Sequence, residues 1–134
     1  MGRGIAEVCA KAGVDVVVVE MTQELMEKSR SGVERSLNRA VERGKLDEPG
    51  RDAALAKLTF STDLAPFADR ALVIEAVVED LGVKQDLFAR IDRIVEADDA
   101  ILASNTSSIS ITQLAISTER PQSVVGMHFF NPAQ

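Results

Sequence analysis

The sequence predicts an α/β fold with an open, mainly parallel sheet. Short apolar runs typical of buried strands occur at residues 16–19, 71–77 and 100–104. Segments in which apolar residues recur at helical spacing separate these runs. Strands that alternate with helices imply right-handed crossovers and parallel pairing. No internal repeat or low-complexity linker interrupts this order.

The predicted elements of the first half are a helix over 5–12, a strand over 16–19, a helix from 22 to about 43, a helix over 51–57 and a strand over 58–61. Gly13 and Gly44 each follow the last apolar residue of a helix, where a left-handed residue commonly ends it. Thr22 is placed to cap the second helix. The unbroken valine run of 16–19 favours a parallel strand that is buried on both faces.

The predicted elements of the second half are a strand over 71–77, a helix over 83–96, a strand over 100–104, a short helix over 110–115 and a strand over 123–129. Ligands of open parallel sheets bind beyond the carboxyl ends of the strands. The candidate residues at those positions are Glu20, Glu79, Asn105 to Ser108, and His128.

Composition and charge limit the class of protein. The 134 residues suffice for one domain with a core, and 46% hydrophobic with 27% charged residues is typical of a globular chain. The net charge of -6 disfavours binding to nucleic acid or to an anionic membrane. The chain shows no signal segment, no membrane-spanning apolar run and no metal-ligand cluster, and Cys9 is its only cysteine. We therefore expect a cytoplasmic protein in which Cys9 is a small core residue.

The first twenty residues are typical of part of a dinucleotide-binding unit. Gly2 and Gly4 open a helix, and Glu20 ends the strand that follows, at about the interval expected for an acid that binds a ribose. Such an acid repels a 2′-phosphate, which favours NAD over NADP. The alternative is that the glycines merely open a helix and that Glu20 is an ordinary strand-end residue. The first strand of the unit and its first two glycines are missing from the chain.

Three longer motifs carry a resemblance to a known family. They are IEAVVEDLGVKQDLF, ASNTSSISIT and VVGMHFFNP. Together they resemble the 3-hydroxyacyl-CoA dehydrogenase family, particularly the bacterial 3-hydroxybutyryl-CoA dehydrogenases, over essentially all 134 residues. The resemblance implies a Rossmann-type NAD-binding domain of an oxidoreductase of fatty acid metabolism (β-oxidation), which transfers a hydride between NAD and C3 of a 3-hydroxyacyl-CoA.

The resemblance also implies roles for single residues. Met1 and Gly2 match the end of the family's glycine motif, and Glu20 matches its ribose-binding acid, which is often aspartate in the family. Glu79 and Lys84 would line the cofactor site. Asn105 and Ser107 would belong to the loop that meets nicotinamide and substrate, and His128 would be the catalytic base.

The proposed chemistry requires these residue types. Oxidation of the alcohol removes a hydride from C3 and a proton from its hydroxyl, and a neutral imidazole such as His128 is a suitable proton acceptor. The Ser107 hydroxyl can hold the substrate oxygen against it. Alternatives remain open: His128 tied to the backbone at a strand end, Ser107 or Ser108 as a turn residue, and Glu79 with Lys84 as a local salt bridge.

Arginines recur every four residues along the second helix, at Arg35, Arg39 and Arg43. This basic strip could bind the phosphates of coenzyme A, or it could be a solvated face balanced by neighbouring glutamates. By resemblance, Ser36 contacts coenzyme A, and Arg43 stands where the family has a lysine that does the same.

We expect residues 1–134 to be one incomplete NAD-binding domain. Its first strand would lie between the 16–19 and 71–77 strands, and a helical C-terminal dimerisation domain would be absent from the chain. The isolated chain should then be poorly soluble and poorly active, with the full-length form a homodimer. Two alternatives remain: a nonenzymatic NAD- or acyl-CoA-binding relative, and a piece of a multifunctional fatty-acid oxidation protein.

Overall fold

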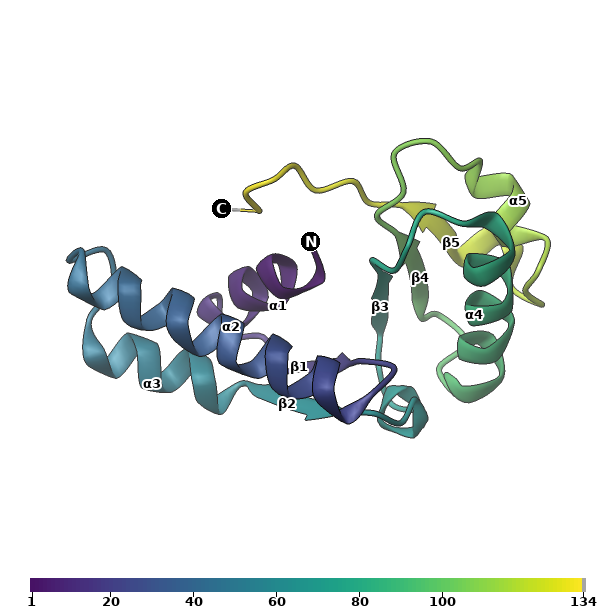
Figure 1. The fold of residues 1–134 in the computed structure, drawn as a ribbon. Coiled ribbons are helices and arrows are strands. Elements are labelled where there is room, and N and C mark those ends of the chain that lie inside the picture. The colour runs from purple at the N-terminus through teal and green to yellow at the C-terminus, as the bar shows by residue number, and fades with distance from the viewer. Residues whose placement is uncertain (134) are drawn as a thin grey trace. The chain divides into compact units, whose positions relative to one another are not determined.

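The computed structural model describes residues 1–133, which divide into two compact units (Figure 1). The first unit contains residues 1–63 together with the segment from Asn131, and the second contains Leu64–Phe130. Strands and helices alternate in both, and every strand pair is parallel. The predicted α/β class with open parallel sheets is confirmed.

The first unit contains α1 (Gly2–Lys11), β1 (Val16–Val19), α2 (Gln23–Glu42), α3 (Glu48–Ala56) and β2 (Leu58–Ser61). β1 and β2 form a two-stranded sheet in which Val16 lies opposite Leu58 and Val19 opposite Ser61. The three helices pack around a small core of Ala10, Val33, Leu37 and Ala54.

Local signals explain where these helices begin and end. The Thr22 hydroxyl accepts a hydrogen bond from the Leu25 N–H at 3.2 Å, which confirms the predicted cap of α2. Gly13 and Gly44 follow α1 and α2 with φ of 84° and 67°, as expected for left-handed residues after a helix. α3 begins earlier than predicted because Asp47 caps it by accepting from the Gly50 N–H at 2.7 Å.

The second unit contains a 3-10 turn (Ala65–Phe67), β3 (Leu72–Glu75), α4 (Leu81–Ile94), β4 (Ile101–Ser104), α5 (Ile111–Ala115), a 3-10 turn (Pro121–Ser123) and β5 (Val124–Gly126). The strands form one parallel sheet in the order β3-β4-β5. α4 and α5 cover the same face of it (Figure 1). The core between helices and sheet includes Phe88, Ile91, Leu102, Leu114 and Val124.

Two strands of this unit end earlier than the sequence predicts. β3 stops at Glu75 rather than at residue 77, because the Val77 N–H donates to the Glu75 side chain. β5 stops at Gly126 rather than at residue 129, because the Phe129 N–H donates to the Asn105 side chain. In both cases a side chain takes a backbone donor that would otherwise extend the strand.

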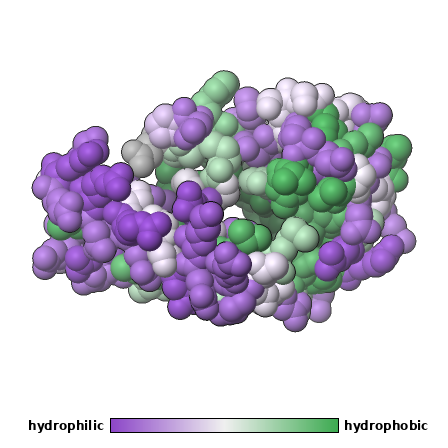
Figure 2. Space-filling view, in the orientation of Figure 1, coloured by the Kyte–Doolittle hydropathy of each residue, from purple (hydrophilic) through white to green (hydrophobic). Residues whose placement is uncertain are grey.

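The expected burial of the valine run on both faces is wrong for the described residues, because all four valines of β1 are only partly buried. β4 does show burial on both faces, since Leu102, Ala103 and Ser104 are all buried. In the second unit, Leu72 and Ile101 are 43% and 41% exposed. Figure 2 shows hydrophobic residues gathered over the region of β3 and β4. No helix among the described residues is long and apolar enough to cross a membrane.

Candidate functional site

A buried carboxylate, Glu75, organises the carboxyl end of β3. Its Oε1 accepts hydrogen bonds from the Lys84 ammonium and from the Val77 N–H, both at 2.6 Å. Its Oε2 accepts from the Ser104 hydroxyl at 2.6 Å. The side chains of Glu75 and Lys84 are each only 1% exposed. Both charges are therefore removed from water, and each depends on the other for compensation.

Lys84 also reaches a second carboxylate, Glu79, which lies at the surface. The Lys84 Nζ is 3.3 Å from the Glu79 Oε2, and the Glu79 side chain is 41% exposed. Glu79 also accepts hydrogen bonds from the hydroxyls of Thr106 and Ser108. The pKa of Glu79 is lowered to about 2, mainly by the hydrogen bond from the Thr106 hydroxyl. The Ser108 hydroxyl and the Lys84 ammonium lower this pKa further, while desolvation of the carboxylate opposes them. The predicted local ion pair of Glu79 and Lys84 is thus present, within a larger network.

The loop after β4 is held by Thr106. Its hydroxyl oxygen accepts from the Ser108 N–H at 3.3 Å and from the Ile109 N–H at 3.0 Å. The turn role that the sequence left open for Ser107 or Ser108 therefore belongs to Thr106. Ser107 is exposed, and within residues 1–133 its hydroxyl makes no hydrogen bond. It is the loop hydroxyl that remains available to a ligand.

His128 lies just beyond β5, on the same carboxyl edge of the three-stranded sheet. Its ring packs at a tilt against Phe130, with 4.8 Å between the ring centroids. The next residue, Phe129, donates its N–H to the Asn105 Oδ1 at 2.7 Å. Asn105 thus fixes the backbone beside His128 to the loop after β4. The imidazole itself is exposed and makes no hydrogen bond to backbone within the described part of the chain, against the alternative of a histidine tied to a strand end.

In the first unit, Glu20 follows β1 as predicted. Its backbone N–H donates to the Ser61 carbonyl at 3.1 Å, and its Oε1 accepts from the hydroxyl of the buried Ser29 on α2. α1 begins at Gly2, and its N-cap residue, Met1, offers no side-chain hydrogen bond to the first-turn amides. Uncapped amides and a helix N-terminus suit a phosphate, and an oriented carboxylate suits a ribose diol. The residues present therefore fit the adenosine diphosphate part of NAD.

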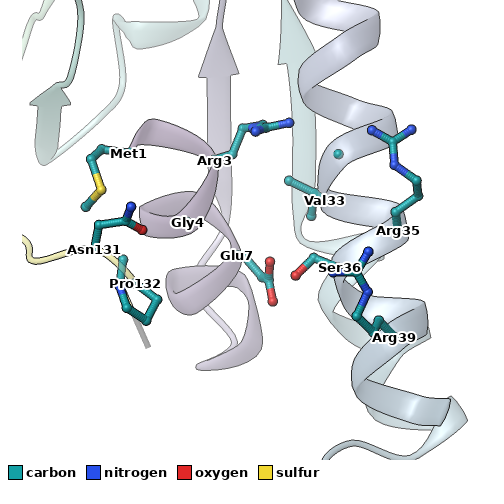
Figure 3. Close-up of a pocket in the computed structure, with 12 residues that line it drawn as sticks. Met1, Arg3, Gly4, Glu7, Val33, Arg35, Ser36, Arg39, Asn131 and Pro132 are labelled. Atoms are coloured by element: carbon teal, nitrogen blue, oxygen red, sulfur yellow. The ribbon is translucent and has the colours of Figure 1, made fainter. Parts of the chain in front are cut away.

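A cavity of about 460 Å³ opens between α1, α2 and residues 131–133 (Figure 3). Ser36 lines it together with Arg35 and Arg39, so these three residues of α2 face one space. Arg43 does not line the cavity; it is exposed and lies at the C-cap of α2. Two of the three arginines in the predicted basic strip are therefore in place to meet one ligand.

Glu75 and Ser104 were not singled out from the sequence, whereas Thr106 fell inside the candidate range Asn105 to Ser108 without a role of its own. One signal was available: Lys84 falls on the apolar stripe of α4, in register with Phe88, Ile91 and Val95. A lysine at a core position requires a buried acid as partner. Glu75 is two residues beyond the buried Val73 on the strand, so alternation places it on the same face.

Residues 1–134 match the family model described as 3-hydroxyacyl-CoA dehydrogenase, NAD binding domain. The chain belongs to this family. The predicted family and the predicted NAD cofactor are confirmed. This chain is therefore an NAD-binding domain of the family, which agrees with the fit of α1 and Glu20.

Curated relatives and solved structures agree with this assignment. A 3-hydroxybutyryl-CoA dehydrogenase of Mycobacterium tuberculosis is 56% identical over 98% of the chain, and the human mitochondrial hydroxyacyl-coenzyme A dehydrogenase is 41% identical over 98%. The crystal structure of M. tuberculosis FadB2 matches with a TM-score of 0.98 at 56% identity, over 99% of this chain and 47% of that one. The chain spans about half the length of the curated relatives it matches, 46% and 44% of the two named here.

Proposed function

We propose that the chain is the NAD-binding half of an enzyme that oxidises the C3 hydroxyl of a short-chain 3-hydroxyacyl-CoA, such as 3-hydroxybutyryl-CoA, to the 3-oxoacyl-CoA. The observation that carries the proposal is His128, which is exposed at the carboxyl edge of the sheet in a chain 56% identical to a 3-hydroxybutyryl-CoA dehydrogenase. Bound NAD would accept the hydride. The residues of this chain would bind, orient and deprotonate the substrate.

His128 is proposed as the base that takes the hydroxyl proton. Its exposed ring makes no hydrogen bond to backbone among the described residues, so its nitrogens are accessible to a substrate. The hydrogen bond from the Phe129 N–H to Asn105 fixes the adjacent backbone and so holds the point from which the ring extends. The Ser107 hydroxyl, also exposed, is proposed to hold the substrate oxygen. A positioned base and a positioned hydrogen-bond partner together favour a reactive geometry.

Roles towards the cofactor are proposed for residues of each unit taken by itself. Met1 and Gly2 at the start of α1 would face its phosphates, and Glu20 its ribose. Glu79 and Asn105 are proposed to line its nicotinamide end, and Lys84, whose side chain is 1% exposed, is proposed to act there through its contact with Glu79. The low pKa of Glu79 keeps that carboxylate ionised at neutral pH. Ser36 is proposed to contact coenzyme A. Arg43 remains a proposed contact outside the cavity.

The whole enzyme is proposed to need more than this chain. Within the described residues, β1 and β3 each pair along one edge only, and we propose that each open edge pairs with a further parallel strand. A helical domain that supplies a homodimer interface is proposed for the part of the relatives that this chain does not cover. We propose a cytoplasmic location, although relatives named as mitochondrial also exist.

The test is turnover of 3-hydroxybutyryl-CoA with NAD by the full-length protein, followed by NADH fluorescence. His128→Gln should lower kcat by about 100-fold or more, as expected for loss of a general base, while the Kd for NADH stays unchanged. Glu20→Ala should weaken NADH binding, whereas Glu24→Ala, at an exposed position in the first turn of α2, serves as the matched control. Equal turnover in the parent and in His128→Gln would refute the assignment.

The competing candidate is a nonenzymatic NAD- or acyl-CoA-binding relative. Ser107 and His128 speak against it, because a pure binding protein has no need of an exposed base at this edge. A full-length protein that binds NADH and coenzyme A yet turns over no 3-hydroxyacyl-CoA would favour this candidate. A piece of a multifunctional fatty-acid oxidation protein would instead be revealed by hydratase activity in the full-length form.

A further inference from the structure

Arg3 lies across α2 at the one position where α2 has no side chain. A Cβ placed on Gly32 would collide with the Arg3 Nη1 and would lie 3.1 Å from its Cζ, which is tighter than most contacts of a Cβ atom. Figure 3 shows the Arg3 side chain extending from α1 towards α2. Gly32 therefore provides the space that the guanidinium of Arg3 occupies, at the wall of the cavity between the two helices.

The cavity gathers positive charge that the protein does not neutralise. Arg3, Arg35 and Arg39 all line it, and within residues 1–133 none of the three forms an ion pair with a carboxylate. The acidic side chain among the lining residues is that of Glu7, which is only 6% exposed. Three guanidinium groups against one carboxylate leave the cavity suited to an anion with more than one negative charge.

The position of Arg3 on its helix is also unfavourable for stability. It lies in the first turn of α1, which contains no acidic residue, and the N-terminal end of a helix disfavours a cation. Nothing in the packing of the first unit requires an arginine there, since its side chain is exposed. A residue that breaks a local rule without a structural gain is expected where function requires it.

We propose that Arg3, seated over Gly32, binds a phosphate group of coenzyme A together with Arg35 and Arg39. It would thereby determine specificity for coenzyme A thioesters over thioesters that lack these phosphates. This inference rests on the proposed function, because it identifies how the same substrate is recognised. The guanidinium of arginine presents a planar pair of hydrogen-bond donors that matches a phosphate, so a lysine, which keeps only the charge, should not fully replace it.

The test compares two substrates in the full-length protein: 3-hydroxybutyryl-CoA and the pantetheine thioester of the same acid, which lacks the nucleotide phosphates. Arg3→Gln should raise KM for the coenzyme A thioester by about tenfold or more, the effect of one lost charge-assisted hydrogen bond, with kcat nearly unchanged. KM for the pantetheine thioester and for NAD should not change. Arg3→Lys should give a KM for the coenzyme A thioester between those of the parent and Arg3→Gln. Gly32→Ala should also raise this KM, because its methyl group displaces Arg3.

Arg51→Gln is the matched control, since Arg51 belongs to the same unit but is paired with Asp52 away from the cavity. A rise in KM for NAD alone would assign the phosphate to the cofactor and overturn the proposal. A KM that is unchanged both for the coenzyme A thioester and for NAD would also overturn the proposal. Calorimetric titration with coenzyme A itself separates this inference from the proposed function: weaker binding by Arg3→Gln supports it without turnover, and a parent protein that does not bind coenzyme A refutes it.

Discussion

Replacing Lys84 by methionine tests the buried ion pair most directly. The substitution keeps much of the aliphatic volume beside Phe88 but leaves the Glu75 carboxylate, 1% exposed, without its cation. Removing one partner of a buried pair costs about 3–5 kcal/mol, because the remaining charge stays buried and uncompensated. Val77 and Ser104 still donate to Glu75, which places the expected loss at the lower end of that range, about 3 kcal/mol.

The assay is urea denaturation of the full-length protein at neutral pH, followed by circular dichroism. Lys57→Met is the control: Lys57 pairs with Asp15 at 3.1 Å, but the two side chains are 39% and 75% exposed. An exposed pair contributes about 0–1 kcal/mol, so this variant should unfold almost as the parent does. The two substitutions remove the same group, and the two lysines differ in burial and in the second carboxylate, Glu79, that Lys84 also contacts.

A double variant, Lys84→Met with Glu75→Gln, completes the cycle. Glutamine is uncharged and can still accept from the Val77 N–H, so the second change should recover part of the loss. We expect a coupling free energy of about 1–3 kcal/mol between the two positions. A cost below about 1 kcal/mol for Lys84→Met, or single costs that simply add in the double variant, would refute the view that the pair is mutually dependent.

Three further predictions follow from other contacts. Arg120→Lys should lower the free energy of unfolding by about 1–3 kcal/mol in urea melts, because lysine cannot replace the fork that binds Asp92 and the carbonyls of Val95 and Ala97 beyond α4. Thr22→Ala should cost about 1 kcal/mol through loss of the α2 cap, and Thr22→Ser should restore it. Folding lowers the pKa of Glu79 from 4.5 to about 2, so the ionised carboxylate stabilises the folded protein. This contribution to the free energy of unfolding is fully present above pH 4.5 and is lost as the pH falls towards 2. The difference in urea midpoint between parent and Glu79→Gln should therefore be constant near neutrality and shrink across that window; a difference independent of pH down to 2 would contradict the assigned cause.

Element order and type were predictable from the sequence because the local signals are strong. The strands at Val16–Val19 and Leu58–Ser61 appear with the predicted bounds, and Thr22 caps α2 as expected. The errors occur where a side chain competes for backbone donors. Glu75 and Asn105 shorten strands that apolar runs alone would extend. The Glu75 contact with Val77 is local, whereas the Asn105 contact with Phe129 joins segments 24 residues apart, which no local pattern indicates.

The candidate site was predictable only in part, for a related reason. Residues that follow strands, such as Glu20 and His128, were found from position in the fold. Glu75 was not, because it lies inside an apolar run and its partners come from α4 and β4, 9 and 29 residues along the chain. Arg3 was likewise not singled out, since its role depends on the absence of a side chain at Gly32 on another helix.

Lys84 has a consequence for anyone who redesigns this domain. Its ammonium joins a fully enclosed carboxylate, Glu75, to a solvent-facing one, Glu79, so a single side chain belongs both to the interior and to the proposed cofactor surface. An engineer who alters Glu79 to change cofactor preference would therefore also disturb the electrostatics of the sheet interior. Changes in binding and in robustness should appear together at these positions, and libraries that vary Glu79 should also vary Glu75 and Lys84.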